Sequence, residues 1–459
     1  MDNSNNFGHT FIRFAETEVI KLKNKKNIAV LGLGKSGIAA ANLAVKLGFD
    51  VFASDKGVKR TVKALNKKVD TEFAGHTDRV LSSSLIVKSP GIHPDIDILK
   101  KAKAAKIPVI SELRFALDNS KYKKLIAVTG TNGKTTTTDL ISKIIKKVFK
   151  KSFVCGNIGF PLSGKALKTS KDAVITLEVS SYQLEDTPGF SPDISVLLNI
   201  TPDHLEHHKT MDNYAAAKKN IFLSQKPSGF AVINADDKIC RKIALRAKAE
   251  KVFFSKKPLK KGVYYQDGKI HINIKGEKAE IKPRIAIPGM HNIENILAAA
   301  AAAFCAGVKP SVIEKTISSY KGVEHRIEFV REINGTRYYN DSKSTNVDST
   351  RVALESFEGN ILLIMGGLDK GAPYTPLAGQ VKKKVKIIYL IGEAAGKIKK
   401  DLCGAVFIES GNIENAVKHA FKTAGSKDIV LLSPACASFD QFSGFEERGK
   451  LFKELVNKL

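Results

Sequence analysis

Residues 130–137, with the sequence GTNGKTTT, combine glycines, a lysine and hydroxyl side chains at the spacing of a phosphate-binding loop. An apolar run at 125–128 precedes this segment and a helical pattern follows it, as a strand, loop and helix would require. The strict pattern needs a glycine at position 128, where this chain has Val128, so the loop is a shortened variant with its GKT core intact. We expect Lys134 to meet the terminal phosphates of a nucleotide and the Thr135 hydroxyl to bind Mg²⁺. The residues of this predicted ATP loop are Gly130, Thr131, Asn132, Gly133, Lys134, Thr135 and Thr136.

A second glycine loop, GLGKSG at 32–37, follows the apolar run 27–31 and precedes a predicted helix over 38–47. Asp55 ends the next predicted strand. Glycines in such a loop permit a tight turn and let a diphosphate approach backbone N–H groups at a helix N-terminus. Taken alone the motif indicates NAD, but any ligand with a diphosphate and a ribose suits it, and a tight turn without ligand is the structural alternative. The candidate binding residues are Gly32, Gly34, Lys35, Ser36, Gly37 and Asp55.

Polar side chains also follow two further predicted strands. Glu178 ends the strand 174–177, and Ser180 and Gln183 come after it. A carboxylate at the carboxyl end of a buried parallel strand is well placed for a metal–phosphate site. The strand 194–200 is followed by TPDHLEHH at 201–208, where we expect a helix to begin at 201–202.

The histidines of that second segment do not have the HExxH spacing of a zinc protease. His204 comes soon after the strand and is therefore the histidine that we expect to be functional. We expect His207 and His208 to lie on the surface.

Lys218 lies on the apolar stripe of a predicted helix over 211–223, together with Tyr214, Ala217 and Ile221. An ammonium group removed from water has a lowered pKa and becomes a reactive amine or a modification site. Alternatively, the stem of Lys218 lies on apolar surface while its charged end reaches water. Periodicity alone leaves both interpretations open.

Three further motifs place polar residues at a helix start or after strands. In HNIEN at 291–295, Asn292 and Asn295 share a helix face and would either contact an adenine edge or simply begin the helix. NDSKSTN at 340–346 and SPACASFDQF at 433–442 each follow a predicted strand. Such loops bind ligands in open α/β sheets, although each could also be a turn without a ligand.

The elements that must position these groups are short apolar strands alternating with helical patterns, which predict an α/β protein with mainly parallel sheets. A length of 459 residues predicts about three domains. The net charge of +28 arises mostly from scattered Lys, which disfavours a nucleic-acid groove. Five Cys without a CxxC spacing, no apolar leader and no run long enough for a membrane span lead us to expect a cytoplasmic protein.

Taken together, these segments resemble the Mur ligases of bacterial cell-wall synthesis over essentially the whole chain beyond the first ~25 residues. The resemblance is carried by ordered motifs, namely GTNGKTTT, LEVSSYQLE, NITPDHLEHH, YAAAKKNIF, GMHNIENILAA, EHRIEF, YNDSKSTN, GGLDKG and LSPACASFDQFSGFEERG. It implies three domains: a Rossmann-like UDP-binding domain at 1–112, a central P-loop ATPase domain at 113–322, and a Rossmann-like amino-acid-binding domain at 323–459. The last three motifs and GLGKSG are similar to those of members that add D-glutamate to UDP-N-acetylmuramoyl-L-alanine.

The resemblance also implies roles for residues at matching positions. The 32–37 loop and Asp55 would then hold UDP rather than NAD. The positions that match contacts to the muramoyl-alanine end are Asn157, Ser180 and Gln183. The nucleotide-binding positions outside the loop are Asn292, Asn295, Arg326 and Asp341. The D-glutamate-binding positions are Lys343, Thr345, Lys370, Ser438 and Phe445. Glu178 and His204 match Mg²⁺ ligands, and Lys218 matches the carbamylated lysine of the family, whose carbamate would help to position a second Mg²⁺. The implied catalytic set is Lys134, Glu178, His204 and Lys218.

The activity implied is an ATP-dependent amide synthesis through an acyl phosphate, yielding ADP and phosphate, as a step of peptidoglycan precursor synthesis and hence of cell shape and division. We expect ATP and two Mg²⁺ ions as cofactors, small-molecule substrates, no nucleic acid and a monomer. The alternatives are a related ligase with another amino acid and, more remotely, a P-loop ATPase associated with nucleic acid.

Overall fold

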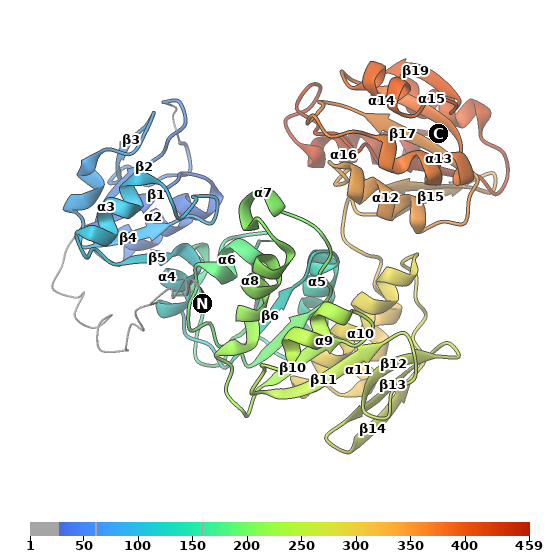
Figure 1. The fold of residues 1–459 in the computed structure, drawn as a ribbon. Helices are drawn as coiled ribbons and strands as arrows, with labels where there is room; N and C mark the ends of the chain where they lie inside the picture. The colour runs from blue at the N-terminus through green and yellow to red at the C-terminus, as the bar shows by residue number, and fades with distance from the viewer. Residues whose placement is uncertain (1–26, 60–61, 158) are drawn as a thin grey trace, which may run out of the picture. The chain divides into compact units, whose positions relative to one another are not determined.

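The computed structural model describes residues 27–59, 62–157 and 159–459. These residues form three sheets that are mainly parallel (Figure 1). They divide into two compact units, one with the residues up to 282 and 294–314, and one with 283–293 and 315–459. The expectation of no leader concerns residues 1–26, which lie outside the described residues. Among the residues that are described, no helix combines the length and the apolar character needed to cross a membrane.

The first sheet has five parallel strands in the order β3-β2-β1-β4-β5. Its elements are β1 (Asn27–Leu31), α2 (Lys35–Lys46), β2 (Asp50–Ser54), β3 (Asp70–Glu72), η2 (Asp78–Ser82), β4 (Leu85–Lys88), α3 (Asp97–Ala104) and β5 (Val109–Ser111). The helix expected at 38–47 begins three residues earlier, because the Ile38 N–H already donates to the Gly34 carbonyl over 3.0 Å. The glycine loop therefore leads directly into the first turn of α2.

The second sheet has nine strands in the order β14-β13-β12-β11-β10-β9-β6-β8-β7, parallel except for the pairings of β13 with β12 and β14. Its strands are β6 (Lys124–Thr129), β7 (Ser152–Gly156), β8 (Val174–Glu178), β9 (Ile194–Leu197), β10 (Phe230–Asn234), β11 (Glu250–Ser255), β12 (Gly262–Gln266), β13 (Lys269–Ile274) and β14 (Glu277–Ile281). The helices of this part of the chain are α4 (Glu112–Asp118), α5 (Lys134–Lys146), η3 (Leu162–Gly164), η4 (Ala166–Lys168), α6 (Ser181–Glu185), α7 (Leu205–His208), α8 (Met211–Leu223), α9 (Lys238–Ala244), α10 (Met290–Cys305) and α11 (Pro310–Ser318).

Strand β6 is buried on both faces, which explains its almost continuous apolar sequence. Alternate residues, Leu125 and Ala127, pack into a core with Tyr214 and Phe222 of α8 and Leu184 of α6. Consequently β6 ends in the interior, and the loop that follows it at 130–133 is held next to α8.

The helix expected at 201–202 does not form there, because the backbone groups of Thr201 pair with a neighbouring side chain. The Thr201 N–H donates to Thr131 Oγ1 over 3.0 Å, and the Thr201 carbonyl accepts from the same hydroxyl over 3.2 Å. Helix α7 instead begins at Leu205, and His204 precedes it with a left-handed φ of 54°.

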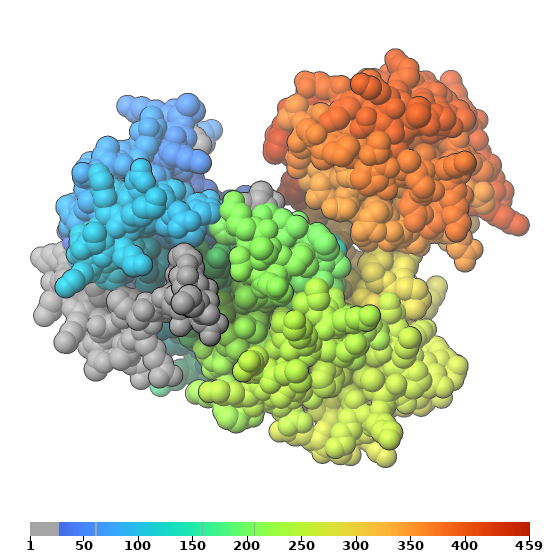
Figure 2. Space-filling model, in the orientation of Figure 1, coloured from blue at the N-terminus to red at the C-terminus, as the bar shows by residue number. Residues whose placement is uncertain are grey.

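The third sheet has the order β15-β16-β20-β17-β18-β19 and is parallel except between β15 and β16. Its elements are β15 (Glu328–Ile333), β16 (Thr336–Asn340), α12 (Val347–Glu355), β17 (Ile361–Gly366), η5 (Thr375–Leu377), α13 (Ala378–Lys384), β18 (Val385–Ile391), α14 (Ala395–Asp401), β19 (Phe407–Gly411), α15 (Ile413–Thr423), β20 (Ile429–Leu432) and α16 (Phe445–Lys458). Figure 2 shows the surface of this part of the chain in orange and red. The predicted fold class, α/β with three mainly parallel sheets, is confirmed.

Candidate active site

The loop at 130–133 is shaped by glycines that could not be replaced without a clash. Gly133 has a φ of +81°, and a Cβ atom there would lie 2.1 Å from the Oδ1 atom of Asn295. Gly130 has a φ of +159°, and its Cβ atom would lie 2.8 Å from the Cβ atom of Leu198. The Thr131 and Asn132 N–H groups of this loop donate to the carbonyl and side-chain oxygens of Asn199 over 2.9 and 2.7 Å. The amides suited to phosphate oxygens are therefore those at the N-terminus of α5.

Two lysine side chains converge on one carbonyl of this loop. Lys134 Nζ donates to the Gly130 carbonyl over 2.9 Å, and Lys218 Nζ donates to the same oxygen over 2.8 Å. Lys134 Nζ also donates to the Thr131 carbonyl over 2.6 Å. The two amines that sequence analysis selected on separate grounds thus lie side by side.

Lys218 is deeply buried, with 1% of its surface exposed, and its Nζ atom lies 4.5 Å from the centre of the Tyr214 ring. Burial, together with the charge of Lys134, lowers the pKa of the Lys218 amine well below its usual range. The prediction that Lys218 faces the apolar side of its helix is confirmed, and the alternative with its charged end in water is excluded. A neutral, buried amine is the form that can react with CO₂.

Glu178 ends β8 with 2% of its surface exposed. Its Oε1 atom accepts a hydrogen bond from Asn157 Nδ2 over 2.9 Å, whereas its Oε2 atom is buried and has no hydrogen-bond partner in the described residues. A buried carboxylate oxygen without a partner is costly unless a cation or donor meets it. The residues at this position therefore fit a hard divalent cation such as Mg²⁺, which prefers oxygen ligands.

The histidines of segment 201–208 are arranged differently from the expectation. His208 is buried and pairs with Ser181 Oγ over 3.0 Å, and His207 Nε2 lies 2.8 Å from Glu185 Oε2. His204 is the exposed one, with 43% of its side chain accessible. The expectation of a surface position was wrong for His208, which is buried, whereas His207 is half-buried, because α7 turns these two side chains toward α6.

These groups surround a cavity of about 620 Å³. Its lining residues are Pro90, Gly91, His93, Lys134, Asn157, Ser180, Ser181, Tyr182, His204, His207, Tyr214 and Lys218. The cavity thus brings together five of the predicted site residues of the central domain.

Ser180 and Gln183 form a reciprocal cap at the start of α6. The Gln183 N–H donates to Ser180 Oγ over 3.2 Å, and the Ser180 N–H donates to Gln183 Oε1 over 3.0 Å. Gln183 is buried and Ser180 lines the cavity. This cap fixes the Ser180 side chain at the start of α6, where the residue lines the cavity.

In the first sheet, Asp55 binds the backbone of the glycine loop after β1 and the backbone just after its own strand, β2. Its Oδ2 atom accepts from the Leu33 N–H over 2.6 Å and its Oδ1 atom from the Gly57 N–H over 2.8 Å. A Cβ atom on Gly37 would lie 1.7 Å from the Gly32 carbonyl oxygen. The third glycine of the motif is therefore required for α2 to pack closely against the loop, and Asp55 holds the loop's shape.

Asn292 and Asn295 are both buried near the start of α10. Asn292 Nδ2 donates to the Pro288 carbonyl over 2.6 Å, a local bond of the helix start. Asn295 Oδ1 accepts from Thr137 Oγ1 of α5 over 3.3 Å and lies against the phosphate loop. Asn295 therefore lies next to the predicted ATP loop.

Asp341 lies in the other compact unit and is buried. Its carboxylate accepts from the Ile327 N–H over 3.1 Å, from Ser433 Oγ over 2.7 Å and from Ser344 Oγ. Burial raises the pKa of Asp341 to about 6, although these hydrogen bonds act in the opposite direction. Asp341 therefore fastens the 341–344 turn to β20 and to the segment that carries Arg326.

Comparison with known proteins decides the family. Family models match the Mur ligase MurD-like N-terminal domain at 26–111, the Mur ligase middle domain at 128–303 and the Mur ligase glutamate ligase domain at 325–436. Two relatives named UDP-N-acetylmuramoylalanine–D-glutamate ligase, from Elusimicrobium minutum and Koribacter versatilis, are 45% and 44% identical to this chain. These alignments cover 96% and 95% of this chain, and 99% and 98% of the relatives. The chain belongs to the Mur ligase family.

Solved structures of other Mur ligases have the same fold. The UDP-N-acetylmuramate-alanine ligase of Thermotoga maritima matches with a TM-score of 0.59 and 18% identity, over 94% of this chain and 99% of that one. The MurF ligase of Thermotoga maritima, solved in complex with ADP, matches with a TM-score of 0.59 and 19% identity, over 95% and 96% of the two chains. These structures therefore support the predicted three-domain Mur ligase architecture.

The amino-acid-binding positions that the Mur ligase resemblance implies come from three loops of one unit. Lys343 Nζ lies 5.9 Å from the centre of the Phe445 ring. Leu368 and Ala437 exchange two backbone hydrogen bonds of 3.0 and 3.1 Å, which hold the loop of Lys370 next to that of Ser438. Ser438 is buried, Thr345 and Phe445 are half-buried, and Lys370 is exposed.

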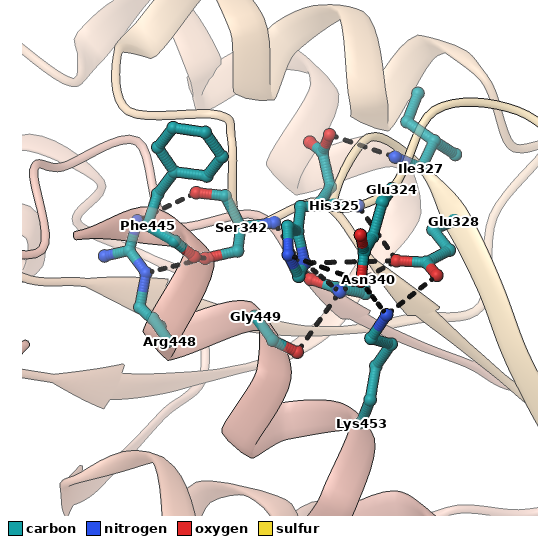
Figure 3. Close-up of polar contacts among 11 residues, drawn as sticks. Glu324, His325, Ile327, Glu328, Asn340, Ser342, Phe445, Arg448, Gly449 and Lys453 are labelled. Carbon is teal, nitrogen blue, oxygen red and sulfur yellow. Dashed lines mark hydrogen bonds and ion pairs between the residues drawn. The ribbon is translucent and has the colours of Figure 1, made fainter. Parts of the chain in front are cut away.

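Arg448 joins two of these loops, although it is not among the site residues predicted from the sequence. Figure 3 shows its hydrogen bonds to Ser342. Its guanidinium group is 1% exposed and donates to the Ser342 carbonyl over 2.9 Å, to Ser342 Oγ over 3.0 Å and to the Cys436 carbonyl over 3.3 Å. Burial lowers the pKa of Arg448 to about 10. A buried arginine within GFEERG has no distinct signal in one sequence, because arginines are common on helix surfaces.

We expect Arg448→Met to raise the KM for D-glutamate about ten- to a hundredfold, because charged hydrogen bonds between two loops contribute about 1.5–3 kcal/mol. The KM for ATP should change much less. Steady-state kinetics with each substrate varied would measure both. Arg351→Met, which removes a half-exposed arginine of α12, is the matched control. Equal changes in both KM values, with a lowered melting temperature, would instead indicate a general loss of structure.

Proposed function

We propose that this Mur ligase adds D-glutamate to UDP-N-acetylmuramoyl-L-alanine with conversion of ATP to ADP and phosphate, a step of peptidoglycan precursor synthesis. The observation that carries the proposal is the convergence of Lys134 and Lys218 on the Gly130 carbonyl in a chain that aligns over 96% of its length with ligases of this name. The reaction forms a peptide bond and requires an activated carboxylate.

A carboxylate is a poor acyl donor because its oxygen is a poor leaving group. In the proposed reaction, a carboxylate oxygen of the sugar peptide attacks the γ-phosphorus of ATP, and ADP leaves. The amine of D-glutamate then attacks the acyl carbon, loses a proton, and phosphate leaves as the amide forms. The protein contributes alignment and charge neutralisation rather than a nucleophile.

On the ATP side, the backbone amides at the N-terminus of α5 would bind phosphate oxygens. The Lys134 ammonium would break its hydrogen bonds to the Gly130 and Thr131 carbonyls and bind the transferring phosphoryl group. Glu178 and the Thr135 hydroxyl would hold Mg²⁺, which supplies positive charge to the phosphates. His204 is accessible in the same cavity and would bind either a second ion or the developing tetrahedral oxygen.

Lys218 in this proposal carries a carbamate. Its neutral amine attacks CO₂ to form an N–C bond, and one proton is released to solvent. The product is an anionic oxygen ligand beside the phosphate loop, in place of an amine that donates to Gly130. The amine of Lys218 donates a hydrogen bond, whereas a carbamate oxygen can bind a cation. A cation site next to Lys134 requires such an oxygen.

On the amino-acid side, Lys343, Thr345, Lys370, Ser438 and Phe445 would bind D-glutamate. Lys343 and Lys370 supply cations for its two carboxylates, and Ser438 and Thr345 supply hydroxyl donors. Asn292, Arg326 and Asp341 complete the proposed nucleotide contacts, and the 32–37 loop holds the UDP moiety.

The test is phosphate release in the presence of ATP and UDP-N-acetylmuramoyl-L-alanine, with D-glutamate, L-glutamate and a panel of other amino acids added in turn. We expect phosphate and amide to appear in equal amounts with D-glutamate and only background with L-glutamate. Amide formation with another amino acid would reassign the specificity within the family. ATP hydrolysis that needs nucleic acid and no sugar nucleotide would overturn the proposal.

A further inference from the structure

Three side chains near the cavity could share a metal ion without belonging to the proposed Mg²⁺ site. Glu185 of α6 and His207 and His208 of α7 each offer a ligand atom, and these atoms all lie within 4.8 Å of one another. His207 Nε2 and Glu185 Oε2 are already 2.8 Å apart. Ligand atoms around tetrahedral zinc are separated by roughly 3.3 Å, so small rotations of these three side chains would bring their ligand atoms to that separation.

The surrounding side chains limit the freedom of these imidazoles. The ring centres of His207 and His208 are 4.7 Å apart, and both rings contact Tyr182 at 4.5 and 5.5 Å. The ring of His93 packs edge-on against His207 at 4.9 Å and is a further imidazole at the same place. Histidines of α7 that are held by packing against Tyr182 and His93 from other segments are preorganised for a ligand.

The site is also reachable from solvent. Glu185 keeps 39% and His207 13% of its side chain exposed. Leu205, the first residue of α7, is 37% exposed. A hydrated ion could therefore enter without unfolding of the helix.

We propose that Glu185, His207 and His208 bind a borderline transition-metal ion of the zinc class, separately from the Mg²⁺ used with ATP. Two imidazoles and one carboxylate suit Zn²⁺, Co²⁺ or Ni²⁺, whereas Mg²⁺ prefers oxygen ligands alone. The bound ion replaces the Glu185–His207 contact and joins α6 to α7. With three protein ligands, a water molecule or His93 would be the fourth ligand of the ion.

The probe is Co²⁺ added to the full-length protein in millimolar Mg²⁺ without nucleotide or sugar substrate, so that the result does not depend on the proposed function. We expect one Co²⁺ per chain with visible absorption bands of a four- or five-coordinate ion, displaced by Zn²⁺ in equimolar amount. Thermal melting should shift upward with Zn²⁺, because an ion that binds only the folded chain stabilises it.

Single substitutions distinguish the proposed transition-metal site from the neighbouring Mg²⁺ site. His207→Gln and Glu185→Gln should each weaken Co²⁺ binding roughly ten- to a hundredfold while the protein melts normally without metal. His204→Gln, which removes a cavity histidine outside the three, should leave the bands unchanged. Absence of Co²⁺ bands, bands that survive both variants, or bands lost with His204→Gln or competed by Mg²⁺ would each overturn the proposal.

Discussion

Lys134→Ala is expected to reduce ATP-dependent amide formation at least a hundred- to a thousandfold. Loss of a single preorganised donor to a developing anion costs on the order of 10²–10³ in kcat. Lys134 is the only lysine of the GTNGKTTT segment, it is the first residue of α5, and its ammonium donates to the Gly130 carbonyl. The measurement is phosphate release together with chromatographic detection of the amide at saturating ATP.

The matched control for this prediction is Lys143→Ala in the same helix. Lys143 is half-exposed and pairs with Asp139 over 2.8 Å, so its loss removes one charge from α5 without affecting the loop. Exposed ion pairs of this kind contribute little to stability. Near-normal turnover by Lys134→Ala, with Lys143→Ala as the reference, would contradict the proposed role of the phosphate loop.

Lys218→Ala is expected to lose most of the activity and to recover part of it when short carboxylic acids are added. The truncation leaves a buried space beside the Gly130 carbonyl, into which formate or acetate can bring the oxygens that the carbamate would supply. Activity should rise with the acid concentration and saturate. Ligase rates of the variant at increasing formate and acetate, at constant ionic strength, measure the effect.

Lys219→Ala provides the comparison, because Lys219 is the next residue of α8 and is less buried than Lys218. It should retain normal activity and show no response to added acids. Full activity of Lys218→Ala without acid would exclude the carbamate. Loss of activity without rescue, in a variant that melts normally, would leave the amine itself as the functional group.

Local sequence patterns determined the features that depend on neighbours along the chain. Three such features are the GTNGKTTT loop, the GLGKSG loop and the helix stripe that holds Lys218 and Tyr214. Each lies within one strand–loop–helix unit or one helix, so the glycines and the apolar periodicity were sufficient to predict it. The alternation of strands and helices predicted the α/β class for the same reason. The ordered motifs then identified the Mur ligase family, which the comparisons confirm.

Tertiary structure alone decided the features that depend on contacts between distant segments. His207 and His208 are turned inward because α7 packs toward Glu185 and Ser181, more than twenty residues earlier in the chain. Arg448 binds Ser342 across a separation of 106 residues, and Lys218 meets Gly130 across 88. One sequence carries the residue types of such pairs but not their proximity, because burial and hydrogen bonding between remote segments exist only once the sheets have formed.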